Sequence, residues 1–342
     1  MHNWECQLDD LINVFLLQAI KFGDVESMFN LGLYYEEVGD FEQMKKYYTM
    51  AIEHGDVQSM YNLGLYYEEA GNFEQMKKYY SMAIEHGDVD SMFNLGLHYQ
   101  NVEKNFEQMK KYYAMASEHG DVTSMFNLGF YYEDVEKNYD QMKKYYAMAI
   151  DHGYVSSMYN LGLYYQNVEK NFEQMKIYYA MAIEHGHVNS MNNLGLHYQN
   201  VEKNYVQMKK YYLMAIEHGN VNSMCNLGFY YEYVEKNFEQ MKKYYSMAIE
   251  RGHLESVNNL GNYYNEIGNY SEALTTYLLN PQKNIAKILG IFRKRESVLE
   301  FITKYKSLID CVEAQKAKIL HLKAKPGGPI FLKAKQHFES HR

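Results

Sequence analysis

Residues 56–87 read DVQSMYNLGLYYEEAGNFEQMKKYYSMAIEHG, and close variants of this stretch recur along most of the chain. The tripeptide Asn-Leu-Gly inside it occurs eight times, 32 or 33 residues apart, beginning at Asn30, Asn62, Asn94, Asn127, Asn160, Asn193, Asn226 and Asn259. A period of this length is typical of stacked repeats, in which each unit buries its apolar face against its neighbours. The sequence therefore predicts a long repeated surface and not a cavity built from unique residues.

Each repeat is expected to be a pair of helices. In the quoted stretch, apolar residues at intervals of three and four run through 57–67 and again through 73–84, which indicates two amphipathic helices. Residues 70–72 interrupt this pattern and are expected to form the turn. Asp56 is suited to cap the first helix, and Gly87 is suited to the left-handed position that ends the second.

We therefore predict an all-α protein, a right-handed α-solenoid of about eight helix-turn-helix repeats with a helical C-terminal tail. An N-terminal capping helix is expected in residues 1–23, and a basic helical tail in residues 281–342. The repeats are expected at residues 24–55, 56–87, 88–120, 121–153, 154–186, 187–219, 220–252 and 253–280. In the longer repeats Val-Glu-Lys-Asn replaces Ala-Gly-Asn, and the extra residue is expected to fall in the loop, where insertions cost little.

The tail differs in charge from the rest of the chain. Residues 281–342 carry 14 Lys or Arg and 5 Asp or Glu, a net charge of +9, whereas the whole chain carries −9. Apolar residues from Val298 to Leu322 alternate at spacings of three and four, which predicts a heptad seam. This seam could pack on the last repeat as a cap, or it could form a coiled coil for self-association through residues 298–322. Its lysines could also bind nucleic acid.

The Asn of each Asn-Leu-Gly is the first candidate for function. First helices normally line the concave groove of such solenoids, and a carboxamide offers both a donor and an acceptor to the backbone of a bound peptide. The eight asparagines, which we name the Asn ladder, are therefore candidate ligand-groove residues. The alternative is structural, because each Asn could bond a neighbouring helix instead.

The residue before each Asn is the second candidate. It is aromatic in the first five repeats, at Phe29, Tyr61, Phe93, Phe126 and Tyr159, and it becomes Asn192, Cys225 and Asn258 in the last three. Acidic residues lie further along the same helices, at Glu36, Glu68, Glu133 and Glu232. An aromatic floor with acidic edges would favour a ligand with apolar and basic residues. Alternatively, the aromatic rings pack on the next first helix.

Two further series are interpreted as structural. Six histidines precede the glycine that ends the second helix, where the helix dipole favours a protonated imidazole; they are His54, His86, His119, His152, His185 and His218. Successive copies are one repeat apart, about 10 Å, which is too far for shared metal ligation. The Lys-Lys pairs at 45–46, 77–78, 110–111, 143–144, 209–210 and 242–243 are expected on a solvated outer face.

The composition argues against several classes of protein. Cys6, Cys225 and Cys311 are odd in number and lack metal-ligand spacing, so we expect neither a disulfide framework nor a zinc site. No stretch approaches 18 apolar residues, and no secretory leader is evident, so we expect no membrane association and an intracellular, cytoplasmic location. We find no phosphate-binding loop and no catalytic motif. We therefore expect no enzymatic activity, no cofactor and no metal.

The run Tyr-Tyr-x-Met-Ala-Ile-Glu-His-Gly-Asp-Val-x-Ser-Met-x-Asn-Leu-Gly-x-x-Tyr resembles the Sel-one-like repeat. The Leu-Gly-x-x-Tyr helix and the short hairpin also resemble the tetratricopeptide repeat. The likeness covers residues 24–280, and the near-identical units rich in Tyr, Asn and Lys also resemble repeat families of giant amoebal viruses. This resemblance implies a non-catalytic scaffold or adaptor whose partners are other proteins, and it implies that the Asn ladder contacts a bound peptide. The less favoured alternative is a nucleic-acid-associated protein that acts through its basic tail.

Overall fold

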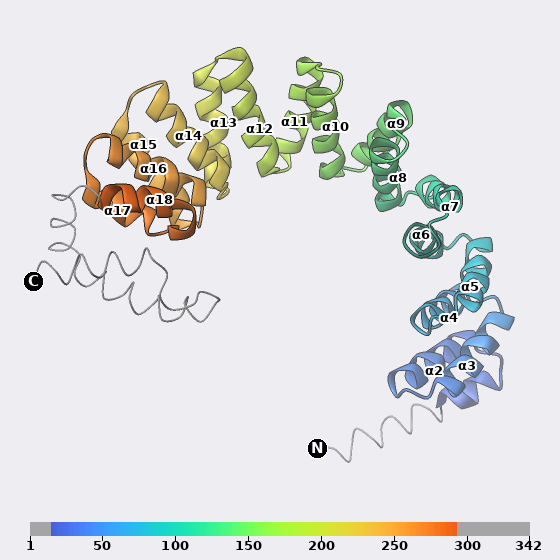
Figure 1. Ribbon diagram of the computed structural model, residues 1–342. Helices are drawn as coiled ribbons and strands as arrows, with labels where there is room; N and C mark the ends of the chain where they lie inside the picture. Colours follow the sequence, from blue (N-terminus) through green and yellow to red (C-terminus); the bar gives the residue numbers. More distant parts are fainter. Residues whose placement is uncertain (1–14, 293–342) are drawn as a thin grey trace, which may run out of the picture. The chain divides into compact units, whose positions relative to one another are not determined.

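The computed structural model describes residues 15–292 (Figure 1). Its contacts divide the chain after His187 into two compact units, which we call unit 1 and unit 2. In both units the regular elements of the described residues are helices, paired into successive hairpins. The predicted all-α solenoid of helical hairpins is confirmed.

Unit 1 contains five hairpins, and each consists of a first and a second helix. A short helical stretch at residues 15–20 precedes them. The helices are α2 (Val25–Glu37), α3 (Phe41–Glu53), α4 (Val57–Glu69), α5 (Phe73–Glu85), α6 (Val89–His98) with the π-helical turn η1 (Tyr99–Glu103), α7 (Phe106–Glu118), α8 (Val122–Asp134), α9 (Tyr139–Asp151), α10 (Val155–Asn167) and α11 (Phe172–Glu184).

Unit 2 contains three hairpins and one further helix. The helices are α12 (Val188–His197) with the π-helical turn η2 (Tyr198–Glu202), α13 (Tyr205–Glu217), α14 (Val221–Tyr233), α15 (Phe238–Glu250), α16 (Leu254–Glu266), α17 (Tyr270–Tyr277) and α18 (Pro281–Phe292). Helix α18 packs against α17. The predicted heptad seam at 298–322 lies outside the described residues.

The ends of the helices follow the sequence signals. The side chain of Asp56 accepts a hydrogen bond from the backbone N–H of Ser59 at 2.7 Å, and Asn72 does the same for Gln75 at the start of α5. These bonds satisfy backbone donors that have no partner within the helix. Gly87 adopts φ +84°, the left-handed conformation that ends a helix, and His86 before it is the C-cap residue.

The core of each hairpin is a tyrosine packed on the glycine of Asn-Leu-Gly. Tyr80 in α5 is fully buried, and a Cβ atom on Gly64 in α4 would stand 2.4 Å from its ring. Any larger residue at Gly64 would therefore force the two helices apart. The same pair recurs in every hairpin, up to Gly261 with Tyr277.

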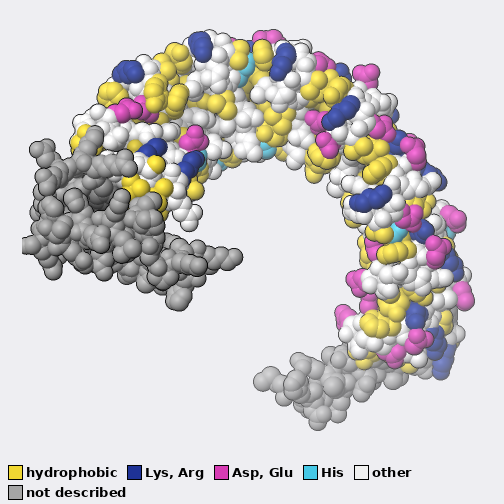
Figure 2. Space-filling view, in the orientation of Figure 1, with side chains coloured by type: hydrophobic (Ala, Val, Ile, Leu, Met, Phe, Trp, Pro, Cys, Tyr) yellow, Lys and Arg dark blue, Asp and Glu magenta, His cyan; other side chains and the backbone are white. Residues whose placement is uncertain are grey.

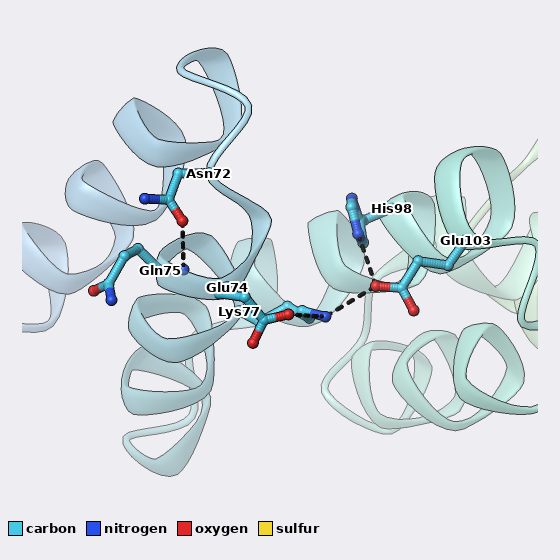
Figure 3. A network of polar contacts seen from close by, with 6 residues as sticks. All are labelled: Asn72, Glu74, Gln75, Lys77, His98 and Glu103. Carbon is cyan, nitrogen blue, oxygen red and sulfur yellow. Dashed lines mark hydrogen bonds and ion pairs between the residues drawn. The ribbon is translucent and has the colours of Figure 1, made fainter.

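The extra residue of the longer hairpins has a structural role that the sequence did not reveal. The lysine of Val-Glu-Lys-Asn takes a left-handed conformation, as Lys104 does with φ 54°. The preceding glutamate then contacts the second helix of the hairpin before it, where Glu103 Oε1 lies 3.0 Å from Lys77 Nζ of α5 (Figure 3). The same oxygen lies 3.2 Å from His98 Nε2 of α6, in its own hairpin. Lys110–Glu136, Lys143–Glu169 and Lys209–Glu235 repeat this ion pair. The loop therefore joins adjacent hairpins and is more than a tolerated insertion.

Candidate binding surface on the first helices

The first helices of successive hairpins form one continuous side within each unit. Helix α4 contacts both α2 and α6, and α12 contacts α14. In unit 1 the second helices α3, α5, α7 and α9 lie on the other side (Figure 1). We call the side formed by the first helices the first-helix face. All eight residues of the Asn ladder are half-buried on these helices, as are the five aromatic residues that precede them in unit 1.

In unit 1 the ladder residues after Asn30 bond a tyrosine of the preceding hairpin. Asn62 Nδ2 donates to Tyr48 Oη at 3.1 Å, Asn94 to Tyr80 at 3.3 Å, and Asn160 to Tyr146 at 3.1 Å. Asn127 has the same bond to Tyr113. These bonds fit the structural alternative stated above. Asn62 Oδ1 also accepts from Gln58 Nε2 at 3.1 Å, and Asn94 also bonds the hydroxyl of Tyr61. A carboxamide has two N–H groups and an oxygen with two lone pairs, so each of these residues keeps at least one hydrogen-bonding position for a further partner.

The acidic residues expected at the edges of the groove are held by the same tyrosines. The hydroxyl of Tyr48 donates to Glu36 Oε2 at 2.6 Å, Tyr80 to Glu68 at 2.7 Å, and Tyr146 to Glu133 at 2.7 Å. Burial, followed by the hydrogen bond to the glutamate, raises the tyrosine pKa values well above their usual range. Burial likewise raises the pKa of Glu133. The hydroxyls therefore remain protonated, and each chain of Glu, Tyr and Asn links three helices.

The aromatic residues before the Asn ladder pack on the buried tyrosine of their own hairpin, a contact that neither sequence interpretation included. The ring of Phe29 lies 6.0 Å from that of Tyr48 in its own hairpin, and Phe93 lies 5.8 Å from Tyr113. Tyr61, Phe126 and Tyr159 repeat this contact with Tyr80, Tyr146 and Tyr179. Two of the rings also contact the start of the next first helix, because Phe126 lies 5.1 Å from Tyr154 and Tyr159 lies 4.5 Å from His187. The ring covers the buried tyrosine that anchors the ladder.

Unit 2 is built differently at the same positions. Asn192 is buried, and its Oδ1 accepts from Ser223 Oγ at 2.9 Å and from Asn226 Nδ2 at 3.3 Å. Its Nδ2 donates to Asn193 Oδ1 at 3.4 Å. In the next hairpin, Asn259 Nδ2 lies 4.0 Å from Cys225 Sγ. Without the aromatic rings, an open hollow of about 280 Å³ lies between α12, α14 and α16.

The lysine pairs divide into two kinds. The first lysine of each pair is half-buried, and several make the ion pairs described above. The second is exposed and lies over a tyrosine ring; the distance from Nζ to the ring centroid is 4.9 Å for Lys46–Tyr47 and 5.1 Å for Lys111–Tyr112. Blue lysines and magenta acidic residues are mixed along unit 1 (Figure 2). The solvated outer face therefore describes the second lysines only.

No cluster of three or more potential metal ligands occurs among residues 15–292. In the same part of the chain, no helix is both long and apolar enough to cross a membrane. The six histidines occupy C-cap positions of second helices, as the sequence indicated.

The sequence did not identify the tyrosine of the Glu–Tyr–Asn chain or the bond between Asn192 and Asn226. A signal for the first was present, since Tyr48 precedes Asn62 by 14 residues and this spacing recurs in unit 1. The second could only be inferred from a structure, because it depends on which partner the carboxamide finds when the ring is absent.

Comparisons with known proteins agree with this architecture. The Tetratricopeptide repeat model matches residues 25–53 and 57–85. The Sel1 repeat model matches residues 89–121, 122–154, 155–187, 188–220 and 221–253. No curated protein matches the chain.

Two solved structures share the fold. One is c5321, a protective antigen of uropathogenic Escherichia coli strains displaying an SLR fold, with 21% identity over 92% of this chain and 75% of that one, and a TM-score of 0.56. The other is a Sel1 repeat protein from Oxalobacter formigenes, with 19% identity over 73% of this chain and 79% of that one, and a TM-score of 0.58. The resemblance to viral repeat families remains a prediction. The hairpins, their stacking and these matches together identify the chain as a repeat protein of the tetratricopeptide and Sel1 type.

Proposed function

We propose that the chain is a non-catalytic scaffold that holds an extended segment of a partner protein along its first-helix face. Repeats of this type are generally protein-interaction scaffolds, which supports the class of function. The observation that carries the proposal is the set of ladder residues that bond a tyrosine of the preceding hairpin and keep at least one hydrogen-bonding position for a ligand, namely Asn62, Asn94, Asn127 and Asn160.

The spacing of the ladder suits an extended peptide. Neighbouring packed helices lie about 10 Å apart, and an extended chain advances about 3.3 Å per residue. One Asn would therefore meet every third residue or so of the bound segment. A carboxamide can bond a peptide unit whatever its side chain, so this contact supports affinity without demanding one sequence.

The charge of unit 1 favours a basic partner segment. Residues 15–187 carry 26 Asp or Glu and 13 Lys or Arg, a net charge of −13, whereas residues 188–292 carry nine of each. Glu36 and Glu68, which accept hydrogen bonds from tyrosine hydroxyls, are among these acidic residues. A segment with basic and apolar residues would complement them and the half-buried rings beside the ladder. The alternative of nucleic-acid binding concerns the basic tail at 281–342, of which residues 293–342 lie outside the described residues.

The test compares two sets of substitutions that break the same bonds from opposite sides. Asn62→Ala, Asn94→Ala, Asn127→Ala and Asn160→Ala together remove the ladder bonds and the carboxamides. Tyr48→Phe, Tyr80→Phe, Tyr113→Phe and Tyr146→Phe together remove the same bonds, and also those from the hydroxyls to Glu or Gln, but leave the carboxamides in place. The ligand is a peptide selected from a random display library against the full chain.

We expect the Asn set to weaken peptide binding by about a hundredfold or more, because each bond to the ligand is worth about 0.5–1.5 kcal/mol. The Tyr set should weaken it only a fewfold. Circular dichroism of both variants should show unchanged helicity. Equal losses of affinity in the two sets would show that the asparagines act only through folding, and failure to select any peptide would contradict the proposal.

A further inference from the structure

The hollow in unit 2 lies where the repeats depart from their own pattern. Asn192 and Cys225 occupy positions that hold an aromatic ring in all five hairpins of unit 1, and both line the hollow. Its other walls include Asn226 and Phe229 from α14 and Asn259 from α16. A space of about 280 Å³ is large enough for one long side chain, and it is open on one side.

The hydrogen bonds around the hollow leave the oxygens of Asn226 and Asn259 as acceptors for a ligand, together with one N–H of each carboxamide. Asn226 Nδ2 donates to Asn192, and Asn259 Nδ2 is directed to Cys225 Sγ, so an N–H of each carboxamide is used within the protein. Their oxygens have no such bond. His253 Nδ1 is occupied by Ser256, whose Oγ lies 2.9 Å away and whose backbone N–H lies 3.2 Å away.

The charge of the hollow is negative. Glu255 is the acidic residue of its lining, and the lining contains neither lysine nor arginine. Burial, and then the carboxylates of Glu255 and Glu232, raise the pKa of the Cys225 thiol, although a hydrogen bond with Ser256 opposes the shift. The thiol is therefore neutral at pH 7, and a cation in the hollow would meet a carboxylate without a competing positive charge.

An aromatic surface borders the acceptors. The ring of Phe229 is 44% exposed, and its centroid lies 4.5 Å from that of Tyr233, which is 54% exposed. A planar cation can stack on such rings while its edge donates to oxygen atoms. Lysine has neither a planar charged group nor donors arranged in a fork, and its ammonium is more strongly hydrated.

We propose that this hollow is a side-chain pocket for an arginine of the segment bound along the first-helix face. The guanidinium would stack on Phe229 and donate to Glu255 and to the oxygens of Asn226 and Asn259. The inference rests on the proposed function, because the arginine belongs to the bound segment. It assigns to unit 2 a specificity that the backbone contacts of unit 1 do not provide.

The test uses a small probe, so that it does not depend on finding the partner. N-acetyl-arginine amide is titrated into the full chain labelled with ¹⁵N-asparagine, and the side-chain amide signals of Asn226 and Asn259 are followed by NMR. The citrulline and lysine analogues serve as probes without the charge and without the planar fork. We expect the arginine compound to shift both signals and to bind at least about fivefold more tightly than either analogue.

Three variants localise the effect. Cys225→Phe places in the hollow the residue that unit 1 carries at Phe29 and Phe126, and it should abolish the shifts. Glu255→Gln should weaken binding about fivefold, and Glu239→Gln, an exposed acid on the second helix α15, should change nothing. If Cys225→Phe disturbs the fold, the loss of binding in Glu255→Gln still tests whether the arginine compound binds in the hollow.

Absence of shifts with the arginine compound, or equal binding of citrulline, would overturn the pocket. A peptide selection that fails while the arginine compound binds would instead contradict the proposed scaffold function.

Discussion

In unit 1 the ladder carboxamides of α4, α6 and α10 donate to tyrosine hydroxyls, whereas in unit 2 the carboxamide of α14 donates to another carboxamide on α12. The two regions share hairpin geometry, buried tyrosines and the glycines beneath them. They differ at the residue before the ladder Asn, which is a ring in unit 1 and Asn192 or Cys225 in the first two hairpins of unit 2. One position per hairpin therefore changes the partner of a neighbouring side chain.

The physical reason is a competition for one N–H group. Where a ring fills the space, the tyrosine hydroxyl is the acceptor within reach of the carboxamide. Where Asn192 replaces the ring, its oxygen offers a second acceptor, and Asn226 bonds to it. The same replacement removes bulk and leaves the hollow. An array of nearly identical units can therefore carry a uniform surface in one part and a distinct pocket in another.

The glycine beneath the tyrosine belongs to the shared framework, and its substitution should have the largest effect. A Cβ atom would stand 2.4 Å from the Tyr146 ring at Gly129 and 2.6 Å from the Tyr245 ring at Gly228. We expect Gly129→Ala and Gly228→Ala each to lower the free energy of unfolding by about 2–3 kcal/mol, since overpacked cores cost this much. Denaturant unfolding of the full chain measures it. A large effect in only one unit would contradict a shared framework.

Removing a tyrosine hydroxyl should distinguish the two units. Tyr146→Phe deletes bonds with both Glu133 and Asn160, and we expect a loss of about 2 kcal/mol. Tyr212→Phe deletes the bond to Gln199, and we expect about 1 kcal/mol. Thermal unfolding followed by circular dichroism compares the two variants. If Tyr212→Phe proves the more damaging, the assignment of ladder partners is wrong.

The smallest effect concerns the charge beside the tyrosine. Burial raises the pKa of Glu133 above its ordinary value of 4.5, so the folded chain holds this proton more tightly than the unfolded chain does. Stability from this group is therefore present at low pH and is lost as the pH rises from 4.5 through the raised pKa. Glu133→Gln should remove that loss and raise stability at pH 7 by less than about 1 kcal/mol.

Natural replacements in the chain support this substitution, since Tyr113 donates to Gln100 at 2.8 Å in the same geometry. The reverse variant Gln199→Glu should bring the same pH dependence into unit 2. Unfolding curves at pH 4 and pH 7 measure both variants. A stability difference between Glu133→Gln and the parent chain that does not grow with pH would contradict the assignment.

Particular residues show which features could be predicted from the sequence and which could not. The period and the caps such as Asp56 predicted where helices begin, because capping and amphipathic spacing are local properties. The Tyr48–Asn62 bond joins two hairpins, and an apolar stripe shows that the tyrosine is buried but not where its hydroxyl points. The change at Asn192 was visible in the sequence. Its consequences, a new partner for Asn226 and a hollow, depend on which acceptor lies nearest in the folded chain.

Site-specific photo-crosslinking tests the central claim, binding along the first-helix face, most directly. Benzoylphenylalanine replaces Leu65 or Leu97 on the first helices α4 and α6, at positions equivalent to Leu196 and Phe229 of the hollow. In matched chains it replaces the exposed Lys78 or Lys111 on the second helices α5 and α7. With the selected peptide bound, we predict crosslinks from positions 65 and 97 and none above background from 78 and 111. Crosslinks from the second helices that equal or exceed those from the first would contradict the account.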